Sequence, residues 1–88
     1  MAASRVWHLY MVRCADGALY SGVTTDLDRR LREHNAGRGS ACTRARRPVR
    51  LVYRKRCVGR GSALRQEAGL KRLSRRKKEG LLRTSWAG

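Results

Sequence analysis

The chain of 88 residues carries 22 Lys and Arg against 6 Asp and Glu, which gives a formal net charge of +16 at pH 7 and an isoelectric point of about 11.6. A chain this short buries only about 60% of the surface that its unfolded form exposes, so we expect one domain without a large substrate cavity. No apolar run approaches the roughly 20 residues of a membrane span, and no signal-peptide apolar block follows residues 1–5, so we expect no membrane partner.

The strong positive charge can be interpreted in two ways. High net charge favours disorder, but 41% of the residues are hydrophobic and their spacing is periodic, so we expect a folded domain. A folded domain this basic repels itself, and a polyanion such as nucleic acid relieves the repulsion. The alternative is a merely solubilising surface, a role that acidic residues serve better than basic ones.

Cys14, Cys42 and Cys57 are odd in number and form no Cys-x-x-Cys pair. Such a set fits neither a disulfide framework nor a zinc knuckle. We therefore expect free thiols in a reducing compartment. This predicts a cytoplasmic protein, associated with the nucleoid if the organism is a bacterium.

Residues 6–24 have the pattern of a β-hairpin. β-Branched and aromatic residues dominate 6–14 and recur in 18–24, and a turn sequence over 15–17 separates the two runs.

The length of the hairpin loop decides where two tyrosines point. A two-residue loop would place Tyr10 and Tyr20 on opposite faces of the sheet, because side chains alternate along a strand. A three-residue loop with Gly17 in the left-handed region pairs Tyr10 with Gly22 and Tyr20 with Val12, so that both rings share one face. We expect the three-residue loop, with open space at Gly22 beside the Tyr10 ring.

The rest of the chain is expected to form helices and one more strand. Thr25 is the candidate N-cap of a helix over about 26–36, which Gly37 ends. Arg30 and His34 lie one turn apart on this helix, beside its apolar stripe. The further expected segments are a loop or short helix over 37–48, a strand over 49–55, a helix capped by Ser62 and running to about Leu73, and a basic helix from Ser74 to about Leu82. We place the domain boundaries at 6–82, with a lead at 1–5 and a flexible tail at 83–88.

Glu67 stands apart from the other acidic residues of the chain. It lies in the middle of an expected helix, on a stripe with Leu64, Ala68 and Lys71 that we expect to face inward. A buried carboxylate is costly unless it is paired or binds a metal. One carboxylate on a rigid helix can hold Mg²⁺ if water and a phosphate complete the shell. The alternative is a salt bridge to a nearby arginine.

Five residues together could cleave a phosphodiester bond: Tyr10, Tyr20, Arg30, His34 and Glu67. A phenol can relay a proton from water, an arginine can neutralise the charge that develops on the phosphate, and a metal can polarise it. Taken singly, each residue has a plainer role. The tyrosines could be strand packing, and Arg30 and His34 a solvated helix face.

The order of these residues resembles the GIY-YIG nucleases. The segment His8-Leu9-Tyr10 and, ten residues later, Tyr20-Ser21-Gly22 are similar to the paired motif of that family. Arg30, His34 and Glu67 fall at the positions of its catalytic helix and of its metal-binding glutamate. Across nearly the whole chain, the sequence resembles the small stand-alone bacterial proteins of the UPF0213 group.

The resemblance implies an α+β fold in which helices flank a three-stranded antiparallel sheet. It implies an endonuclease acting on nucleic acid, most of all DNA, with one divalent metal, Mg²⁺ or Mn²⁺, on Glu67. Tyr10 or Tyr20 would then be the general base or orient the attacking water. Arg30 would clamp the scissile phosphate, and His34 would carry a proton or contact the phosphate.

A non-catalytic, basic nucleic-acid-binding module on the same scaffold is the alternative function. A decayed nuclease is expected to lose Glu67 or Arg30 first, and both are present. Two family positions differ, since Val23 stands where some members carry a lysine and no asparagine follows Glu67. These differences bear on the rate of the reaction. A binder of anionic membranes is disfavoured, because it would need a long amphipathic helix.

We expect the domain's own basic surface to hold the DNA. Such side chains contact phosphates and carry little sequence information, so we expect low sequence specificity and steep salt dependence, with single-stranded or branched DNA favoured. The candidates are Arg44, Arg46, Arg47 and Arg50 in one segment, and Lys71, Arg72, Arg75, Arg76, Lys77 and Lys78 near the C-terminus.

Overall fold

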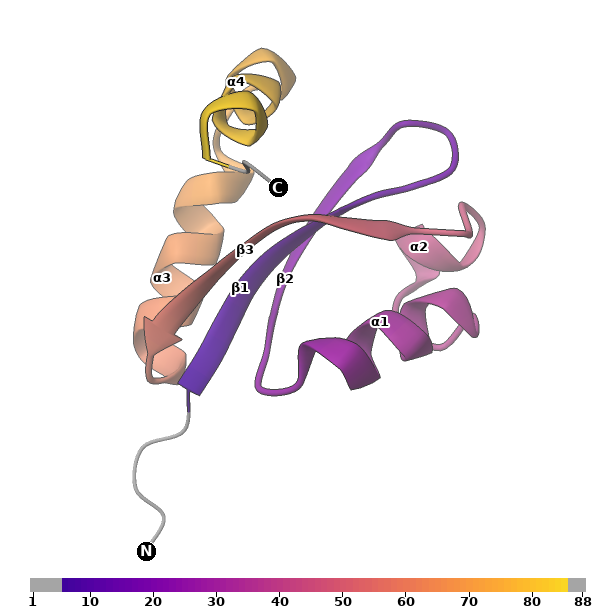
Figure 1. Ribbon diagram of the computed structural model, residues 1–88, viewed down its shortest axis with the longest axis horizontal. Helices are drawn as coiled ribbons and strands as arrows, with labels where there is room; N and C mark the ends of the chain where they lie inside the picture. Colours follow the sequence, from indigo (N-terminus) through magenta and orange to yellow (C-terminus); the bar gives the residue numbers. More distant parts are fainter. Residues whose placement is uncertain (1–5, 86–88) are drawn as a thin grey trace, which may run out of the picture.

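The computed structural model describes residues 6–85 as a three-stranded antiparallel sheet with helices on both faces (Figure 1). The strand order is β2-β1-β3, so β1 lies at the centre and pairs with both neighbours. The predicted α+β fold is confirmed. The elements are β1 (Val6–Arg13), β2 (Leu19–Thr24), α1 (Leu27–Asn35), α2 (Ala41–Arg44), β3 (Arg50–Val58), α3 (Arg60–Lys71) and α4 (Arg75–Ser85). The predicted lead at 1–5 and residues 86–88 of the predicted tail lie outside the described residues.

The hairpin of β1 and β2 has the predicted three-residue loop. Gly17 adopts a φ of +89°, a conformation that glycine reaches without a steric cost. The register places Tyr10 opposite Gly22 and Val12 opposite Tyr20, so both tyrosines project from the same face. A Cβ added at Gly22 would lie 2.5 Å from the Tyr10 hydroxyl oxygen, so the missing side chain makes the space that the ring fills.

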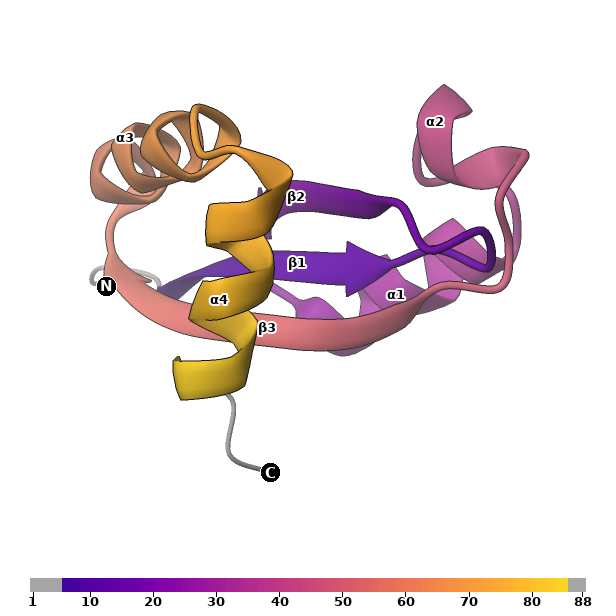
Figure 2. The ribbon, with the colours of Figure 1, turned by 90° about the horizontal axis from the view of Figure 1, so that it is seen from above.

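Each face of the sheet has its own hydrophobic core, and different helices cover the two faces (Figure 2). Leu9 and Met11 of β1 pack toward α3 and α4. Tyr10 and Val12, the alternate residues, pack toward α1 and its Leu27. The pleat of the central strand therefore directs Tyr10 to the layer that also carries Arg30 and His34.

The N-cap of α1 is Asp26, and the prediction of Thr25 is wrong by one residue. The Asp26 carboxylate accepts a hydrogen bond from the Arg29 backbone N–H at 3.0 Å. A carboxylate at this position also interacts favourably with the positive end of the helix dipole. The helix ends as predicted, with Gly37 at a φ of +85° just beyond it.

Helix α3 begins at Arg60, two residues before the predicted cap Ser62. Gly59, with a φ of +85°, makes the turn out of β3, so the helix starts directly after it. The other boundaries also differ from the prediction: β3 continues to Val58 and α4 to Ser85, and the uncertain 37–48 segment contains the short helix α2.

The inward face of α3 is also not the predicted one. Ala63 and Leu70 are buried against the sheet, and Glu67 lies on the same face, half-buried. The remaining members of the predicted stripe, which are Leu64, Ala68 and Lys71, are exposed. No helix within residues 6–85 has the length and apolar content needed to span a bilayer.

Candidate active site

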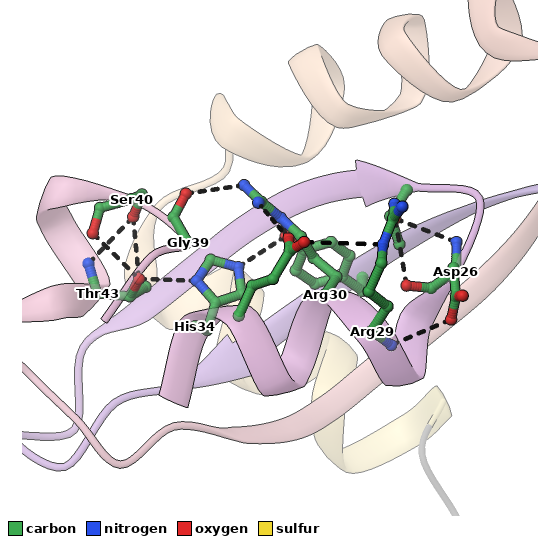
Figure 3. Close-up of polar contacts among 10 residues, drawn as sticks. Asp26, Arg29, Arg30, His34, Gly39, Ser40 and Thr43 are labelled. Atoms are coloured by element: carbon green, nitrogen blue, oxygen red, sulfur yellow. Dashed lines mark hydrogen bonds and ion pairs between the residues drawn. The ribbon is translucent and has the colours of Figure 1, made fainter. Parts of the chain in front are cut away.

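Four of the five predicted site residues meet on the α1 face of the sheet. Figure 3 shows two of them, Arg30 and His34, side by side on α1. The Tyr10 hydroxyl lies 2.9 Å from His34 Nε2, and Arg30 Nε donates to the same hydroxyl oxygen at 3.4 Å. The Tyr20 ring lies edge-on to the imidazole, with ring centroids 5.3 Å apart. The spacing of four residues between Arg30 and His34 puts both on one side of α1, so one helix presents them to both strands of the hairpin.

Burial divides this cluster into an inner and an outer part. Tyr10 is 1% exposed and His34 is fully buried. Tyr20 is only half-buried, and its hydroxyl has no hydrogen-bond partner among the residues that the structure describes. The Arg30 side chain is 27% exposed. Solvent or a substrate can therefore reach Tyr20 and Arg30, while Tyr10 and His34 lie behind them.

The inner pair is held in its neutral form. Burial raises the pKa of Tyr10, and the neighbouring Arg30 guanidinium opposes this only in part. Burial also lowers the pKa of His34, and the charge of Arg30 lowers it further. Near pH 7 a protonated phenol therefore faces a neutral imidazole, which is able to accept a proton.

The Arg30 guanidinium keeps part of its donor capacity free. Its Nη1 donates to a Glu33 carboxylate oxygen at 3.0 Å, and its Nη2 donates to the Gly39 carbonyl at 2.9 Å. With the bond to Tyr10, three of the five N–H groups of an arginine are engaged, and two remain for a ligand. A cleft of about 210 Å³ lies beside it, lined also by Trp7 and Arg29. Glu33 lines the cleft as well and pairs with both arginines. Two cations against one carboxylate leave the cleft with a net positive charge, which favours an anionic group such as a phosphate.

Glu67 is separate from this cluster. Within residues 6–85 its ionic partner is Lys71, at 3.3 Å on the next turn of α3, and no hydrogen bond joins it to the other four residues. Its charge nevertheless contributes to the raised pKa of Tyr10, which places the carboxylate within electrostatic range of the inner pair. The Glu67 side chain is 17% exposed, and that of Lys71 is 56% exposed. An ion pair this open is weak, so it leaves the carboxylate available to a cation.

The donor set around Glu67 fits a hard cation that keeps most of its water. The described part of the chain contains no group of three or more His, Cys, Asp or Glu side chains that could enclose a metal. Mg²⁺ is commonly bound through one or two carboxylates together with waters and substrate phosphates, whereas zinc requires three or four protein ligands. The single, half-buried carboxylate of Glu67 is therefore sufficient for Mg²⁺ and insufficient for zinc.

The predicted DNA-binding residues form two segments joined at the hairpin loop. Arg46 pairs with Asp16 of that loop at 2.9 Å, and Arg75 donates to the Gly17 carbonyl at 2.9 Å. Arg46 and Arg75 are therefore partly engaged within the protein. The candidates that are exposed and have no side-chain partner within residues 6–85 are Arg44, Arg50, Arg72, Arg76 and Lys77.

Sequence reasoning missed several residues that contact the site. Thr43 Oγ1 lies 2.7 Å from His34 Nδ1, and the Gly39 carbonyl accepts from Arg30. Glu33 also pairs with Arg30. The spacing of Glu33 three residues after Arg30 was a usable signal. Gly39 and Thr43 belong to no periodic pattern, because Gly39 lies in the loop after α1 and Thr43 lies in α2, a helix of only 4 residues.

Comparison with known proteins identifies the family to which this chain belongs. The family model of the GIY-YIG catalytic domain matches residues 6–80. A UPF0213 protein of Desulfotalea psychrophila is 47% identical over 83 residues, which cover 93% of this chain and 76% of the relative. A UPF0213 protein of Halobacterium salinarum is 46% identical over 74 residues, covering 84% of this chain and 96% of the relative.

Two solved structures have the same fold. The solution structure of the UPF0213 protein BH0048 from Bacillus halodurans superimposes with a TM-score of 0.62 at 41% identity, covering 93% of this chain and 87% of that one. The solution structure of the E. faecalis protein EF2693 gives a TM-score of 0.60 at 38% identity, covering 94% and 86%. On the strength of the domain match and of these relatives, the chain belongs to the GIY-YIG family and, within it, to the UPF0213 group.

Proposed function

We propose that this protein is a metal-dependent endonuclease that hydrolyses phosphodiester bonds in nucleic acid, chiefly DNA. The observation that carries the proposal is the convergence of Tyr10, Tyr20, Arg30 and His34 on one face of the sheet, beside a cleft that is open to solvent. Membership of the GIY-YIG family, whose matching model is that of a catalytic domain, supports it. The free cysteines of the described residues and a DNA substrate are both in keeping with the cytoplasm, and with the nucleoid in a bacterium.

Arg30 is the phosphate-binding group in this proposal. Its two remaining N–H groups can donate to two phosphate oxygens, and its permanent charge stabilises the negative charge that grows on them as water attacks. The bonds to Glu33 and Gly39 hold the guanidinium in place before substrate arrives. A pre-oriented donor needs no rearrangement during the reaction.

Tyr20 orients the attacking water, and the inner pair of Tyr10 and His34 takes up its proton. Tyr20 is half-buried, and its hydroxyl has no hydrogen-bond partner among the described residues, whereas the Tyr10 hydroxyl contacts a neutral imidazole. As the water oxygen bonds to phosphorus and the bond to the leaving sugar oxygen breaks, the water's proton passes to Tyr10 while Tyr10 passes its own to His34 Nε2. The leaving oxygen takes a proton from solvent.

Glu67 would hold the Mg²⁺ or Mn²⁺ ion. When bound, such an ion stabilises charge on the phosphate and on the leaving oxygen. Helix α3 keeps the carboxylate half-buried and in electrostatic range of Tyr10, and among the described residues its ionic partner is an exposed lysine.

A cleavage assay with matched variants tests this function. Purified protein with Mg²⁺ or Mn²⁺ is incubated with labelled single-stranded, duplex and branched DNA and with RNA, and we expect cleavage of DNA with little dependence on sequence. Glu67→Ala should abolish cleavage while DNA binding persists, because binding depends on the basic surface. Gln66→Ala, on the same helix, is the control and should retain both. If Glu67→Ala cuts as fast as wild type, the site assignment is wrong or a contaminant is responsible.

A non-catalytic nucleic-acid-binding module is the second candidate function. The exposed cations Arg44, Arg50, Arg72 and Arg76, which have no ionic partner within residues 6–85, would serve it equally well. It predicts salt-sensitive binding without cleavage in either metal, and binding that Arg30→Ala hardly changes. Loss of cleavage in Arg30→Ala, with binding retained, would exclude it.

A further inference from the structure

The segment after α1 contacts both Arg30 and His34, although neither its sequence nor the family match assigns it a role. The Gly39 carbonyl accepts a hydrogen bond from Arg30 Nη2 at 2.9 Å. Four residues later, Thr43 Oγ1 lies 2.7 Å from His34 Nδ1. Figure 3 shows these two contacts approaching the side chains from the same side, opposite to the start of α1. One short segment therefore fixes two of the four converging side chains.

This segment is closely fitted to the imidazole. A Cβ added at Gly39 would lie 2.6 Å from His34 Cγ and 2.7 Å from Cε1, well inside ordinary contact distance. Thr43 is fully buried, although it carries a polar side chain. Ser40 is the N-cap of α2, and its hydroxyl accepts from the Thr43 backbone N–H at 3.1 Å. The position of the Thr43 hydroxyl is thus set by the turn that starts α2.

The hydrogen-bond partners decide which imidazole nitrogen carries the proton. The buried Tyr10 hydroxyl accepts a hydrogen bond from Arg30. The proton of this hydroxyl also needs an acceptor, and among the described residues that acceptor is His34 Nε2. A buried hydroxyl without an acceptor is costly, so Nε2 is unprotonated and Nδ1 carries the hydrogen. Nδ1–H then donates to Thr43 Oγ1, and the Thr43 hydroxyl donates to the Ser40 carbonyl at 3.4 Å or to the Ser40 hydroxyl at 3.0 Å.

We propose that Thr43 is a positioning residue that holds His34 as the Nδ1–H tautomer, with Nε2 directed at the Tyr10 hydroxyl. The inference rests on the proposed function, because its consequence is the readiness of His34 to accept the proton of Tyr10. The same logic orients the histidine of a serine protease, where a carboxylate accepts from Nδ1. A neutral hydroxyl gives the same orientation without adding a charge to the buried site.

The tautomer of His34 tests the proposal independently of catalysis. Imidazole ¹⁵N chemical shifts, measured near pH 7.5, distinguish a protonated from an unprotonated nitrogen. In the wild type we expect protonated Nδ1 and unprotonated Nε2 at His34. In Thr43→Val, which keeps the shape but lacks the hydroxyl, we expect a mixture of tautomers, whereas Thr43→Ser should retain the wild-type pattern. A wild-type His34 protonated at Nε2, or a Thr43→Val spectrum identical to wild type, would overturn the proposal.

Cleavage kinetics give the second readout. Thr43→Val should lower kcat by about 10-fold to 100-fold with little change in KM for DNA, and Thr43→Ser should stay close to wild type. Equal kcat in Thr43→Val and wild type would contradict the positioning role. If the wild type does not cut DNA at all, the proposed function fails. The wild-type ¹⁵N spectrum would still show which nitrogen of His34 carries the proton. This measurement does not depend on the folding of any variant.

Discussion

Substituting Gly22 by alanine should disturb the inner pair of the site without replacing any of the side chains that take part in the proposed reaction. The added Cβ would lie 2.5 Å from the Tyr10 hydroxyl oxygen and 2.7 Å from Cζ of the ring. Ordinary contacts between carbon atoms are about 3.5–4.0 Å, so the ring has to move by about 1 Å. Tyr10 is 1% exposed, so there is no free volume into which it can move without displacing its neighbours.

The expected cost follows from two opposing effects. Overpacking a closely packed core lowers the free energy of unfolding by about 1–3 kcal/mol. Replacing glycine by alanine within a strand raises it by about 0.5–1 kcal/mol. We expect a net loss of about 1–2 kcal/mol in the free energy of unfolding, measured by urea denaturation at unchanged slope. Because the ring also loses its geometry with His34 and Arg30, cleavage should fall by about 100-fold, the cost typical of a 1 Å misplacement.

Gly69→Ala is the matched control. Nothing lies within 4 Å of a Cβ built at this glycine of α3. The variant should gain about 0.5–1 kcal/mol of stability and cleave at the wild-type rate. If Gly22→Ala unfolds at the same urea concentration as the wild type and cleaves equally fast, then Tyr10 does not pack against Gly22 as described.

Three further predictions concern stability, pH and DNA binding. The Asn35 side chain donates to the Val49 carbonyl at 3.1 Å and accepts from the Val49 N–H at 2.7 Å, which links α1 to the start of β3. Asn35→Ala should therefore lower the free energy of unfolding, measured by urea denaturation, by about 1–3 kcal/mol. An unchanged urea midpoint would refute this link. Burial lowers the pKa of His34. Below about pH 6.5 the His34 imidazole is therefore protonated more readily in the unfolded chain than in the folded chain. Stability should therefore fall as the pH drops from 6.5, and a plot of Tm against pH should be flatter over this range in His34→Gln. Arg72 is exposed and has no ionic partner among the described residues, so we expect it to contact a phosphate. Arg72→Ala should weaken binding to all DNA sequences alike and reduce the salt slope by about 1, as measured by titration at several salt concentrations.

Short-range sequence patterns were sufficient to predict the hairpin and the side of α1 that carries Arg30 and His34. Side chains alternate strictly along strands, so the loop length alone fixed the shared face of Tyr10 and Tyr20, and Gly17 indicated that length. The four-residue spacing of Arg30 and His34 likewise places both on one side of any helix. Both inferences depend only on the backbone period.

The same reasoning failed for α3, where small and apolar residues lie on more than one side of the helix. Leu64 and Ala68 are as apolar as Ala63 and Leu70, so the pattern does not select a face. The sheet selects it, because only Ala63 and Leu70 fit closely against β1 and β3 while Leu64 remains 38% exposed.

The sequence by itself determined the class of fold, through its resemblance to a known family. It also determined the shared face of the tyrosines and the basic character of the surface, because these two follow from short periods along the chain and from composition. Only the tertiary structure decided which groups hold His34 and Arg30, since Gly39 lies in a loop and Thr43 in a helix of 4 residues, which is too short to show a period in the sequence. Their contacts arise where the chain folds back over α1, and such contacts depend on the path of the backbone through space, which no local pattern encodes.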